Sequence, residues 1–417
     1  MTASSAPSCC VPPSEAAPSL GPSSLGFWAR PHGPLEPAAR ALVLVALALI
    51  SLGIVVVYSA SWASGLVYEA DPTYYVRRQA IWAGLGVIGM FAAMRVDPRR
   101  LKRVAGPFVV VSIVLLAVLF IPGVAPTIKG ARRWIRIAGF SFQPSEMAKL
   151  ALILWLATHL GRNAMRMEDW KRGTLPAVVP LALTAFLILI EPDFGTALFI
   201  GAVGLAMTLV GGVPVRRLVL LGIYALPAIA WQVDKRWDVF MTRIAAVGGG
   251  EGEGAAAYQV QQSLVALGSG GWFGRGLGAG HQKLFFLPEA RTDFILPVVG
   301  EELGFLGTSI VMLLFAALVG CGLRVALGAA RRDRFGFLLT FGLVFWIGLQ
   351  AAGNVAVVTA SVPTKGIALP FISLGGSSLV VLCIAVGLVY SVARHVDARA
   401  QAESGVRAQR VTVGGDA

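Results

Sequence analysis

Apolar runs of roughly twenty residues recur along most of this chain and are separated by mostly short polar connections. A helix needs a run of that length to cross the hydrocarbon core of a bilayer. The pattern predicts about ten membrane-spanning helices, at residues 39–59, 79–97, 104–123, 144–160, 174–191, 194–212, 217–233, 294–323, 335–358 and 376–393. The eighth run is longer than a bilayer requires, so we expect that helix to tilt or to project from the membrane.

The composition indicates a membrane protein rather than a soluble one. Of the 417 residues, 56% are hydrophobic and 14% are charged, and the mean hydropathy is +0.74, whereas a soluble domain carries about 25% charged residues. Residues 1–38 are rich in Ser, Pro and Ala and are expected to form a disordered cytoplasmic tail. The expected fold is therefore an all-α polytopic membrane protein, with one membrane domain at 39–394 and a second cytoplasmic tail at 395–417.

The net charge of +13 is explained by the distribution of Lys and Arg over the loops. One side of the membrane holds 21 of the 35 basic residues, in both tails and in short loops such as 95–103, 162–172 and 324–334. Because cytoplasmic loops collect Lys and Arg, this distribution predicts that both chain ends lie on the cytoplasmic side. The chain has no basic soluble module with interleaved aromatic residues, so nucleic-acid binding is not expected.

This topology places one large loop outside, at residues 234–293, between the seventh and eighth helices. The loop is not plainly polar, because Val260, Leu264, Val265 and Leu267 recur with helical spacing. Amphipathic helices on the membrane surface and re-entrant pieces packed within the protein both fit this pattern. Seven glycines between 268 and 280 indicate a backbone that bends or is closely approached.

Charged residues at the outer ends of the helices are candidates for a binding site. Arg132 and Arg133 lie in a short outer loop where few cations are expected. They could contact lipid headgroups or bind an anionic substrate, since arginine holds phosphate oxygens bidentately. Glu146 and Lys149 share a helix face and could form a structural ion pair or contact substrate. Asp193 could cap the sixth helix or face the same site.

Asp293 stands at the start of the eighth helix, at the edge of the hydrocarbon. An ionised carboxylate is costly there unless it faces protein, water or a ligand, so an N-cap and a functional group are both compatible with its position. Glu301 and Glu302, further along, are interpreted as buried polar structure. Lys365 and Ser377 belong to a Pro- and Gly-rich approach to the last helix, whose N-terminus could bind an anion. All these motifs fall on the outer side, which favours a single extracytoplasmic site.

Sequence motifs for common cofactors are absent or lie in unsuitable positions. The stretch Gly84–Gly89 matches a dinucleotide fingerprint by letter, but it lies within a predicted helix and is better explained by close helix packing. The sequence contains no GxxxxGKS or GxxxxGKT motif, so no nucleotide is expected as a cofactor. The four histidines are scattered and no HExxH pattern occurs, which argues against a dedicated zinc site.

Six strings of residues carry a resemblance to a known family: KGARRWI at 129–135, QPSEMAKL at 143–150, EPDFGTAL at 191–198, YQVQQSLVALGSGGWFGRGLG at 258–278, LPEARTDFILPVVGEELG at 287–304 and PTKGIALPFISLGGSS at 363–378. Through them the chain resembles the SEDS family of FtsW, RodA and SpoVE, from about Tyr58 to Arg394. The strings at 288–290 and 364–366 are more similar to the FtsW members, which act in cell division, than to RodA.

The resemblance implies a peptidoglycan glycosyltransferase that polymerises lipid II into glycan strands, at the outer face of the cytoplasmic (inner) membrane and during septal cell-wall synthesis. Asp293 matches the essential aspartate of the family, and Glu146, Lys149 and Asp193 match polar positions of its central cavity. The expected substrate-binding residues are Arg132, Arg133, Trp134, Glu146, Lys149, Asp193, Lys365 and Ser377. A class B penicillin-binding protein and other division proteins are the implied partners.

The expected reaction is an inverting single displacement. Asp293 removes the proton from the acceptor's 4-hydroxyl, and undecaprenyl diphosphate leaves. Arg132, Arg133, Lys149 and Lys365 are candidates to neutralise the diphosphate, together with a divalent cation, Mg or Mn, that Asp293 could ligate. A transporter that flips lipid II, a rod-elongation polymerase like RodA and a scaffold for a partner synthase stay open as alternatives.

The chain departs from its relatives in three places. Arg291 stands where His is usual, Leu374 stands where Tyr is usual, and the glycine-rich stretch Gly248–Gly254 replaces the usual start of the large outer loop. These departures leave the local shape of the loop open, along with any metal or substrate contact near Arg291.

Overall fold

The fold is given by a computed structural model, which describes residues 34–414 except 128–131, 138–139, 192, 236, 246 and 248–253. Lys129 and most of the stretch Gly248–Gly254 thus lie outside the described residues. The helices are α1 (Glu36–Glu69), α2 (Tyr74–Arg95), α3 (Pro98–Val118), α4 (Pro144–Arg162), α5 (Leu175–Ile190), α6 (Phe194–Val210), α7 (Val215–Asp234), α8 (Trp237–Ala245), α9 (Ala255–Ser269), α10 (Ile295–Ala329), α11 (Arg334–Val358) and α12 (Gly376–Gly414). A short antiparallel hairpin joins β1 (Ile135–Ile137) to β2 (Phe140–Phe142).

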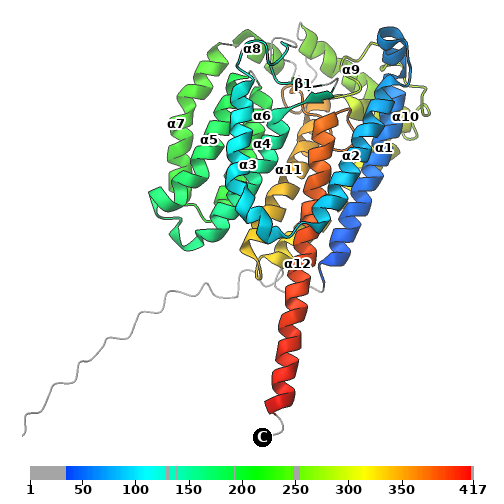
Figure 1. Ribbon diagram of the computed structural model, residues 1–417. Coiled ribbons are helices and arrows are strands. Elements are labelled where there is room, and N and C mark those ends of the chain that lie inside the picture. The colour runs from blue at the N-terminus through cyan, green and yellow to red at the C-terminus, as the bar shows by residue number, and fades with distance from the viewer. Residues whose placement is uncertain are drawn as a thin grey trace, which may run out of the picture. The chain divides into compact units, whose positions relative to one another are not determined.

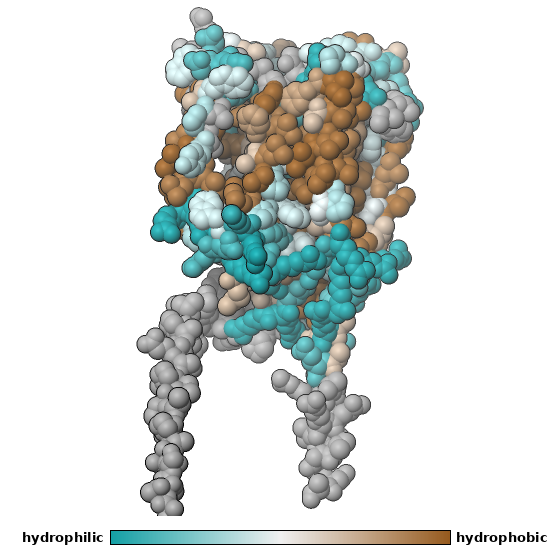
Figure 2. Space-filling model, turned by 60° about the vertical axis from the view of Figure 1, so that its left-hand side comes forward, coloured by the Kyte–Doolittle hydropathy of each residue, from teal (hydrophilic) through white to brown (hydrophobic). Residues whose placement is uncertain are grey.

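The described chain is an all-α polytopic membrane protein, with a helix at each of the ten predicted positions (Figure 1). Six segments are long and apolar enough to cross a membrane: α1, α3, α10, α11, α12 and the stretch Trp170–Ile190, which contains α5. The helix α6 is apolar but shorter. Figure 2 shows a broad apolar band across the face in view, with hydrophilic side chains gathered below it. Whether α2, α4 and α7 cross, and which end faces outward, stays a prediction.

Two predicted helix ends are wrong, and one small hairpin was not predicted. The first helix continues to Glu69, ten residues beyond the expected end, because its outer turns pack against the loop that precedes α10. The last helix does not stop at 393 but runs to Gly414, so most of the expected tail at 395–417 is helical. The small hairpin of β1 and β2 is an exception to the all-α expectation and lies just before α4.

The long eighth run is broken rather than simply tilted. Gly304 has φ 68° and ψ −164°, which interrupts α10 after the short piece Ile295–Leu303. A glycine-rich segment fills the break: Phe305 N donates to Gly271 O at 2.8 Å, and Gly276 N donates to Glu302 O at 3.0 Å. Because the break is held by this segment, the piece 295–303 is a separate half-helix at one end of the bundle.

The large loop packs within the protein. Its helix α9 buries Val260, and Ser263 Oγ donates to Val358 O of α11 at 2.8 Å. Of the two expected arrangements, packing inside the protein is therefore confirmed for α9. The glycines behave as predicted, since a Cβ at Gly270 or Gly274 would collide with the backbone of Gly300 or Glu302.

The helices α2 and α12 approach closely, as the small residues of Gly84–Gly89 predict. A Cβ at Gly86 would lie 2.9 Å from Cys383 Sγ, and a Cβ at Gly387 would collide with Met90 O. At the base of this pair, Asp397 of α12 accepts hydrogen bonds from Leu35 N at 2.7 Å and Glu36 N at 2.8 Å. The last helix thereby caps the N-terminus of the first, which has no side-chain cap of its own.

Four segments far apart in the sequence meet at one end of the bundle, the upper end in Figure 1, where the hairpin, α8 and α9 lie. The segments are the start of α4, the connection from α5 to α6, the stretch before α10 and the stretch before α12. We refer to this end as the outer end, because the charge pattern assigns it to the outside.

Candidate active site

Asp293 lies in a segment that is tied to the approach to α12. Asn354 of α11 is 1% exposed and donates to both Asp293 O and Ile367 O at 2.7 Å. Ser373 Oγ donates to Thr292 O at 2.6 Å. These hydrogen bonds fix the backbone around Asp293 from the opposite loop, so the position of its carboxylate is set by tertiary contacts.

Asp293 is half-buried and stands one position before the N-cap residue of α10, which is Phe294. A Cβ added at Gly366 would lie 2.9 Å from Asp293 Oδ2, so the carboxylate lies against the backbone of the Thr364–Gly366 turn. Gly366 therefore leaves room beside the carboxylate.

Glu146 and Lys149 form a buried ion pair on the first turns of α4. The Nζ–Oε1 distance is 2.8 Å, and the side chains are 9% and 6% exposed. Ser378 Oγ of α12 donates to Glu146 Oε2 at 3.0 Å. Ser377 instead accepts a hydrogen bond from Gln143 N at 3.2 Å. The pair thus joins α4 to α12, with Ser378 rather than Ser377 in contact with Glu146.

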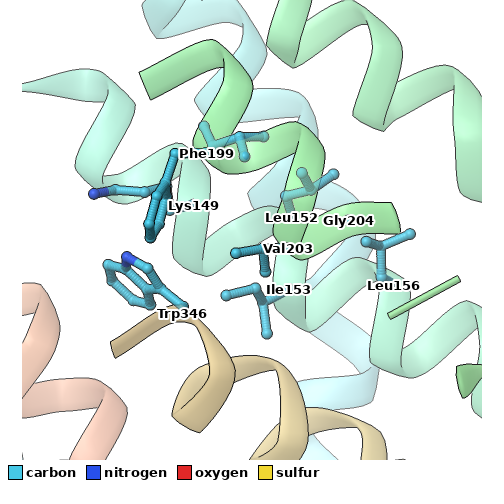
Figure 3. Close-up of a pocket in the computed structure, with 9 residues that line it drawn as sticks. Lys149, Leu152, Ile153, Leu156, Phe199, Val203, Gly204 and Trp346 are labelled. Carbon is cyan, nitrogen blue, oxygen red and sulfur yellow. The ribbon is translucent and has the colours of Figure 1, made fainter. Parts of the chain in front are cut away.

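A small pocket of about 10 Å³ lies beside Lys149, between α4, α6 and α11 (Figure 3). Lys149 Nζ lies 5.0 Å from the centre of the Trp346 ring and 5.8 Å from that of Phe199. The pocket has room for about one water molecule. Lys149 is the only charged residue among the described side chains that line it, so no polar path continues through this pocket.

Asp193 caps α6 and also lies beside Arg133, and its contact with a substrate stays a prediction. Its Oδ1 accepts from Thr196 N at 3.1 Å and caps α6, and its Oδ2 lies 3.6 Å from Arg133 Nη1. Lys365 lies beside the same helix start, since a Cβ at Gly195 would be 3.5 Å from Lys365 Cβ. Lys365 Nζ lies 5.5 Å from the centre of the Phe194 ring, and burial lowers its pKa.

The remaining two candidates are less well placed. Arg132 is exposed and its Nε donates to Thr127 Oγ1 at 3.2 Å, within its own loop. Trp134 is half-buried just before β1. The structure therefore brings Arg133, Glu146, Lys149, Asp193, Asp293 and Lys365 to one end of the bundle, with Ser377 at the helix start beside them and Arg132 at the edge.

Comparison with known proteins shows the family to which the chain belongs. The family profile described as "Cell cycle protein", of FtsW, RodA and SpoVE, matches residues 39–398. The chain belongs to the FtsW, RodA and SpoVE family. It is most like the FtsW members.

Individual relatives cover nearly the whole family domain. The chain is 42% identical over 356 residues to a probable peptidoglycan glycosyltransferase FtsW of Geobacter sp., covering 85% of this chain and 96% of that protein. It is 38% identical to the stage V sporulation protein E of Bacillus subtilis, covering 85% of this chain and 96% of the relative.

Two solved structures share the fold. The rod shape determining protein RodA of Thermus thermophilus matches with a TM-score of 0.61 and 30% identity, over 85% of this chain and 95% of RodA. A chain of a peptidoglycan synthase complex, solved to explain how polymerization and crosslinking are coordinated, matches with a TM-score of 0.64 and 27% identity, over 85% and 97% of the two chains.

Glu301 and Glu302 of this FtsW-like chain are buried polar structure, as expected. Lys283 Nζ lies 2.6 Å from Glu302 Oε1 and donates to Ser59 Oγ at 2.9 Å. Glu301 accepts from His281 N at 2.8 Å and Gln282 N at 3.1 Å. The two carboxylates hold the segment before Asp293 to the half-helix 295–303 and to α1.

Several residues of the site escaped the sequence interpretation. Ser378, Asn354 and Lys283 are ordinary polar residues whose partners lie far away in the sequence. Glu191 is 3% exposed beside Asp193, and its Oε1 has no hydrogen-bond partner in the described part of the chain. Glu191 and Ser378 gave a signal, because they belong to the strings EPDFGTAL and PTKGIALPFISLGGSS, but nothing in the sequence favoured them over Asp193 and Ser377.

A divalent cation does not find a ready set of ligands here. Among the described residues, no three His, Cys, Asp or Glu side chains form a group that could hold a metal ion. Mg²⁺ is commonly held by one or two carboxylates together with substrate phosphates, so Asp293 and a bound diphosphate could share such an ion. The mechanism proposed below assigns its steps to the residues of the chain.

Glu191 should make stability depend on pH. Burial and the neighbouring Asp193 raise its pKa from 4.5 to about 8. As the pH rises from about 4.5 to 8, the unfolded chain loses this proton before the folded chain does, so stability falls. Glu191→Gln should remove this loss and stabilise the protein at pH 8, by up to about 1.4 kcal/mol per pKa unit.

Thermal unfolding of the wild type and Glu191→Gln at pH 4 to 8.5 would test this. The difference between their unfolding midpoints should be smallest at the acid end, where both the folded and the unfolded wild type are protonated at position 191. A difference that is equally large at every pH would contradict the prediction.

Proposed function

We propose that this protein is a peptidoglycan glycosyltransferase that polymerises lipid II into glycan strands at the outer face of the cytoplasmic membrane. The observation that supports it most directly is the position of Asp293 at the outer end. Its backbone carbonyl accepts a hydrogen bond from Asn354, and its half-buried carboxylate lies against the Thr364–Gly366 turn, which contains Lys365. A relative named probable peptidoglycan glycosyltransferase FtsW is 42% identical to this chain over 356 residues.

In the proposed reaction, Asp293 acts as a general base. Its carboxylate takes the proton of the acceptor's 4-hydroxyl while that oxygen attacks the anomeric carbon of the donor. The bond from the anomeric carbon to the diphosphate breaks, and undecaprenyl diphosphate leaves with the electron pair. Asp293 then releases its proton to water. A single displacement of this kind inverts the anomeric carbon and needs one base rather than two close carboxylates.

The leaving diphosphate requires cations at the outer end. Arg133 is partnered by Asp193, and Lys149 is partnered by Glu146. No carboxylate in the described residues forms an ion pair with Lys365, whose ammonium faces the Phe194 ring. We therefore assign the main neutralising charge to Lys365, with Arg133 and Lys149 turning toward the diphosphate when it binds.

Removing this charge should slow polymerisation. Lys365→Ala is expected to lower kcat about a hundredfold, because a cation aimed at developing negative charge contributes on that order. Lys365→Arg should retain a measurable part of the activity. The matched control is Lys235→Ala, which removes an exposed cation near the same end, beside Trp231. Equal rates for Lys365→Ala and Lys235→Ala would contradict the assignment.

The partner is proposed to be a class B penicillin-binding protein. One structural relative was solved in a peptidoglycan synthase complex, whose name couples polymerization with crosslinking. With such a transpeptidase and other division proteins, the chain would act at the division septum, as its similarity to FtsW rather than RodA favours. An elongation role like that of RodA remains the alternative within the family.

The decisive experiment gives labelled lipid II to the purified chain and its transpeptidase in lipid vesicles. Gel separation should show a ladder of glycan chains, and lipid II should not need to cross the membrane. If no polymer forms but lipid II changes leaflets, the protein is a transporter instead. The apolar pocket beside Lys149 makes that outcome unexpected, since a translocation path for a charged headgroup needs polar groups at mid-depth.

A further inference from the structure

A second cavity lies on α1, beside the segment that leads to Asp293. It measures about 330 Å³, which is within the range of small-ligand sites of about 300–1,000 Å³. One wall is formed by Ser64 and Tyr68, which are four residues apart on the outermost turns of α1. The other wall is the segment Phe285–Arg291, and Lys283 contributes to the lining. We call this space the α1 cavity.

Aromatic side chains flank the α1 cavity. Tyr68 is 66% exposed and Phe285 is 49% exposed, and their rings meet edge to face with centres 5.9 Å apart. Large exposed rings beside a polar cavity offer flat apolar faces to a ligand with C–H groups, such as a sugar ring. An aromatic belt at the membrane surface is the alternative explanation for such rings.

Charged groups in the same cavity distinguish these two explanations. Glu289 and Arg291 line it, and the Arg291 guanidinium lies 4.1 Å from the centre of the Tyr75 ring. The ammonium of Lys283 is held by Ser59, Gly278 O and Glu302 in the buried cluster at its base. A belt that only contacts lipid needs no cavity with charged residues in its lining, whereas a saccharide bearing carboxylates needs apolar faces and a cation such as Arg291. The Glu289 carboxylate accepts a hydrogen bond from Thr292 Oγ1 at 2.9 Å.

The backbone of this wall is held in an uncommon shape. Phe285 has φ 67° and Glu289 has φ 55°, both in the left-handed region that non-glycine residues rarely adopt. The end of the wall is tied down, because Leu374 N donates to Arg291 O at 3.0 Å. The wall is thus preformed, and Asp293 follows its last residue by two positions.

We propose that the α1 cavity binds an amino-sugar disaccharide that carries an acidic peptide, with the Tyr68 and Phe285 rings against the sugar and Arg291 on a carboxylate. This inference rests on the proposed function, since a polymerase must hold two lipid-linked saccharides at one catalytic carboxylate. The segment 285–293 separates the α1 cavity from the turn that contains Lys365 and Gly366, so one saccharide would lie on each side of Asp293.

The direct test measures binding of a soluble ligand. The probe is N-acetylglucosaminyl-N-acetylmuramyl pentapeptide without lipid, titrated onto the full chain in nanodiscs and followed by saturation-transfer NMR. Tyr68→Ala should weaken binding about three- to tenfold, as expected for the loss of one aromatic contact. Tyr68→Phe should bind like the wild type. The control Tyr224→Ala removes a 79% exposed tyrosine from α7, away from the cavity, and should have no effect.

Polymerisation assays with lipid II and the transpeptidase show whether the α1 cavity holds the lipid II precursor or the growing glycan strand. A higher KM for lipid II in Tyr68→Ala, with product chains of unchanged length, places the precursor in the cavity. Shorter product chains at an unchanged KM place the growing strand there. If binding, KM and chain length all equal those of Tyr224→Ala, the saccharide site is refuted.

The two hypotheses fail in distinguishable ways. If the wild type polymerises lipid II while Tyr68→Ala behaves like the control, the proposed function is supported and the saccharide site in the α1 cavity is refuted. If the wild type forms no polymer but binds the soluble disaccharide, and this binding depends on Tyr68, the saccharide site is supported and the polymerase function is refuted.

Discussion

Replacing Asp293 with alanine or asparagine is expected to lower the rate of glycan polymerisation about a thousandfold, within the 10²–10⁴ range of a positioned general base. Asp293 is partly exposed and the N-cap residue of α10 is Phe294, so we expect the substitution to remove the base while α10 stays folded. The measurement is the initial rate of chain formation from labelled lipid II, with the transpeptidase present.

The control for this prediction is Asp71→Asn. Asp71 is a carboxylate of the connection from α1 to α2, paired with Arg77 at 3.1 Å and outside the candidate site. It should leave polymerisation near the wild-type rate. Binding of lipid II should persist in Asp293→Asn, since the loss is in the chemical step. If Asp293→Ala and Asp71→Asn polymerise at the same rate, another group is the base.

Breaking the Lys283–Glu302 pair is expected to be the most destabilising single change in the outer half of the molecule. The side chains are 1% and 2% exposed and the Nζ–Oε1 distance is 2.6 Å. Glu302→Ala leaves the Lys283 ammonium buried without its counter-ion, which costs about 3–5 kcal/mol. Unfolding by SDS in mixed micelles measures this change in the free energy of unfolding.

A double variant separates charge loss from loss of the residues themselves. Lys283→Met with Glu302→Leu replaces both ions by apolar groups of similar size and should recover most of the lost stability, because a buried pair is often close to neutral relative to such a replacement. If Glu302→Ala unfolds like the wild type, the pair does not hold the segment before Asp293. If the double variant is as unstable as the single one, packing rather than charge explains the loss.

The secondary structure was accessible from the sequence because each helix carries its own apolar run. The helix α9 was likewise visible in the spacing of its apolar residues. The break in α10 was not visible, since the helical sequence continues on both sides of Gly304 and the conformation of Gly304 depends on the segment 270–276. The extension of α12 was also missed, because the polar composition of 395–414 resembles that of a tail.

The candidate site was predictable at the level of segments but not of side-chain contacts. The charge pattern and the topology inferred from it predicted that five residues lie at one end of the bundle: Glu146, Lys149, Asp193, Asp293 and Lys365. The choice between Ser377 and Ser378 depends on the rotation of α12 against α4, which neighbouring positions in a sequence cannot reveal. The same holds for Asn354, whose importance comes from two carbonyls in other segments.

The hydrogen bonds from Leu35 and Glu36 to Asp397 join parts of the chain separated by 361 and 362 positions. During synthesis the first helix enters the membrane long before Asp397 leaves the ribosome. The N-terminal amides of the first helix have no acceptor, and the surface of α2 has no packing partner, until α12 has been synthesised. The bundle therefore closes only at the end of translation, and a chain truncated before Gly376 leaves the surface of α2 that packs on α12 uncovered.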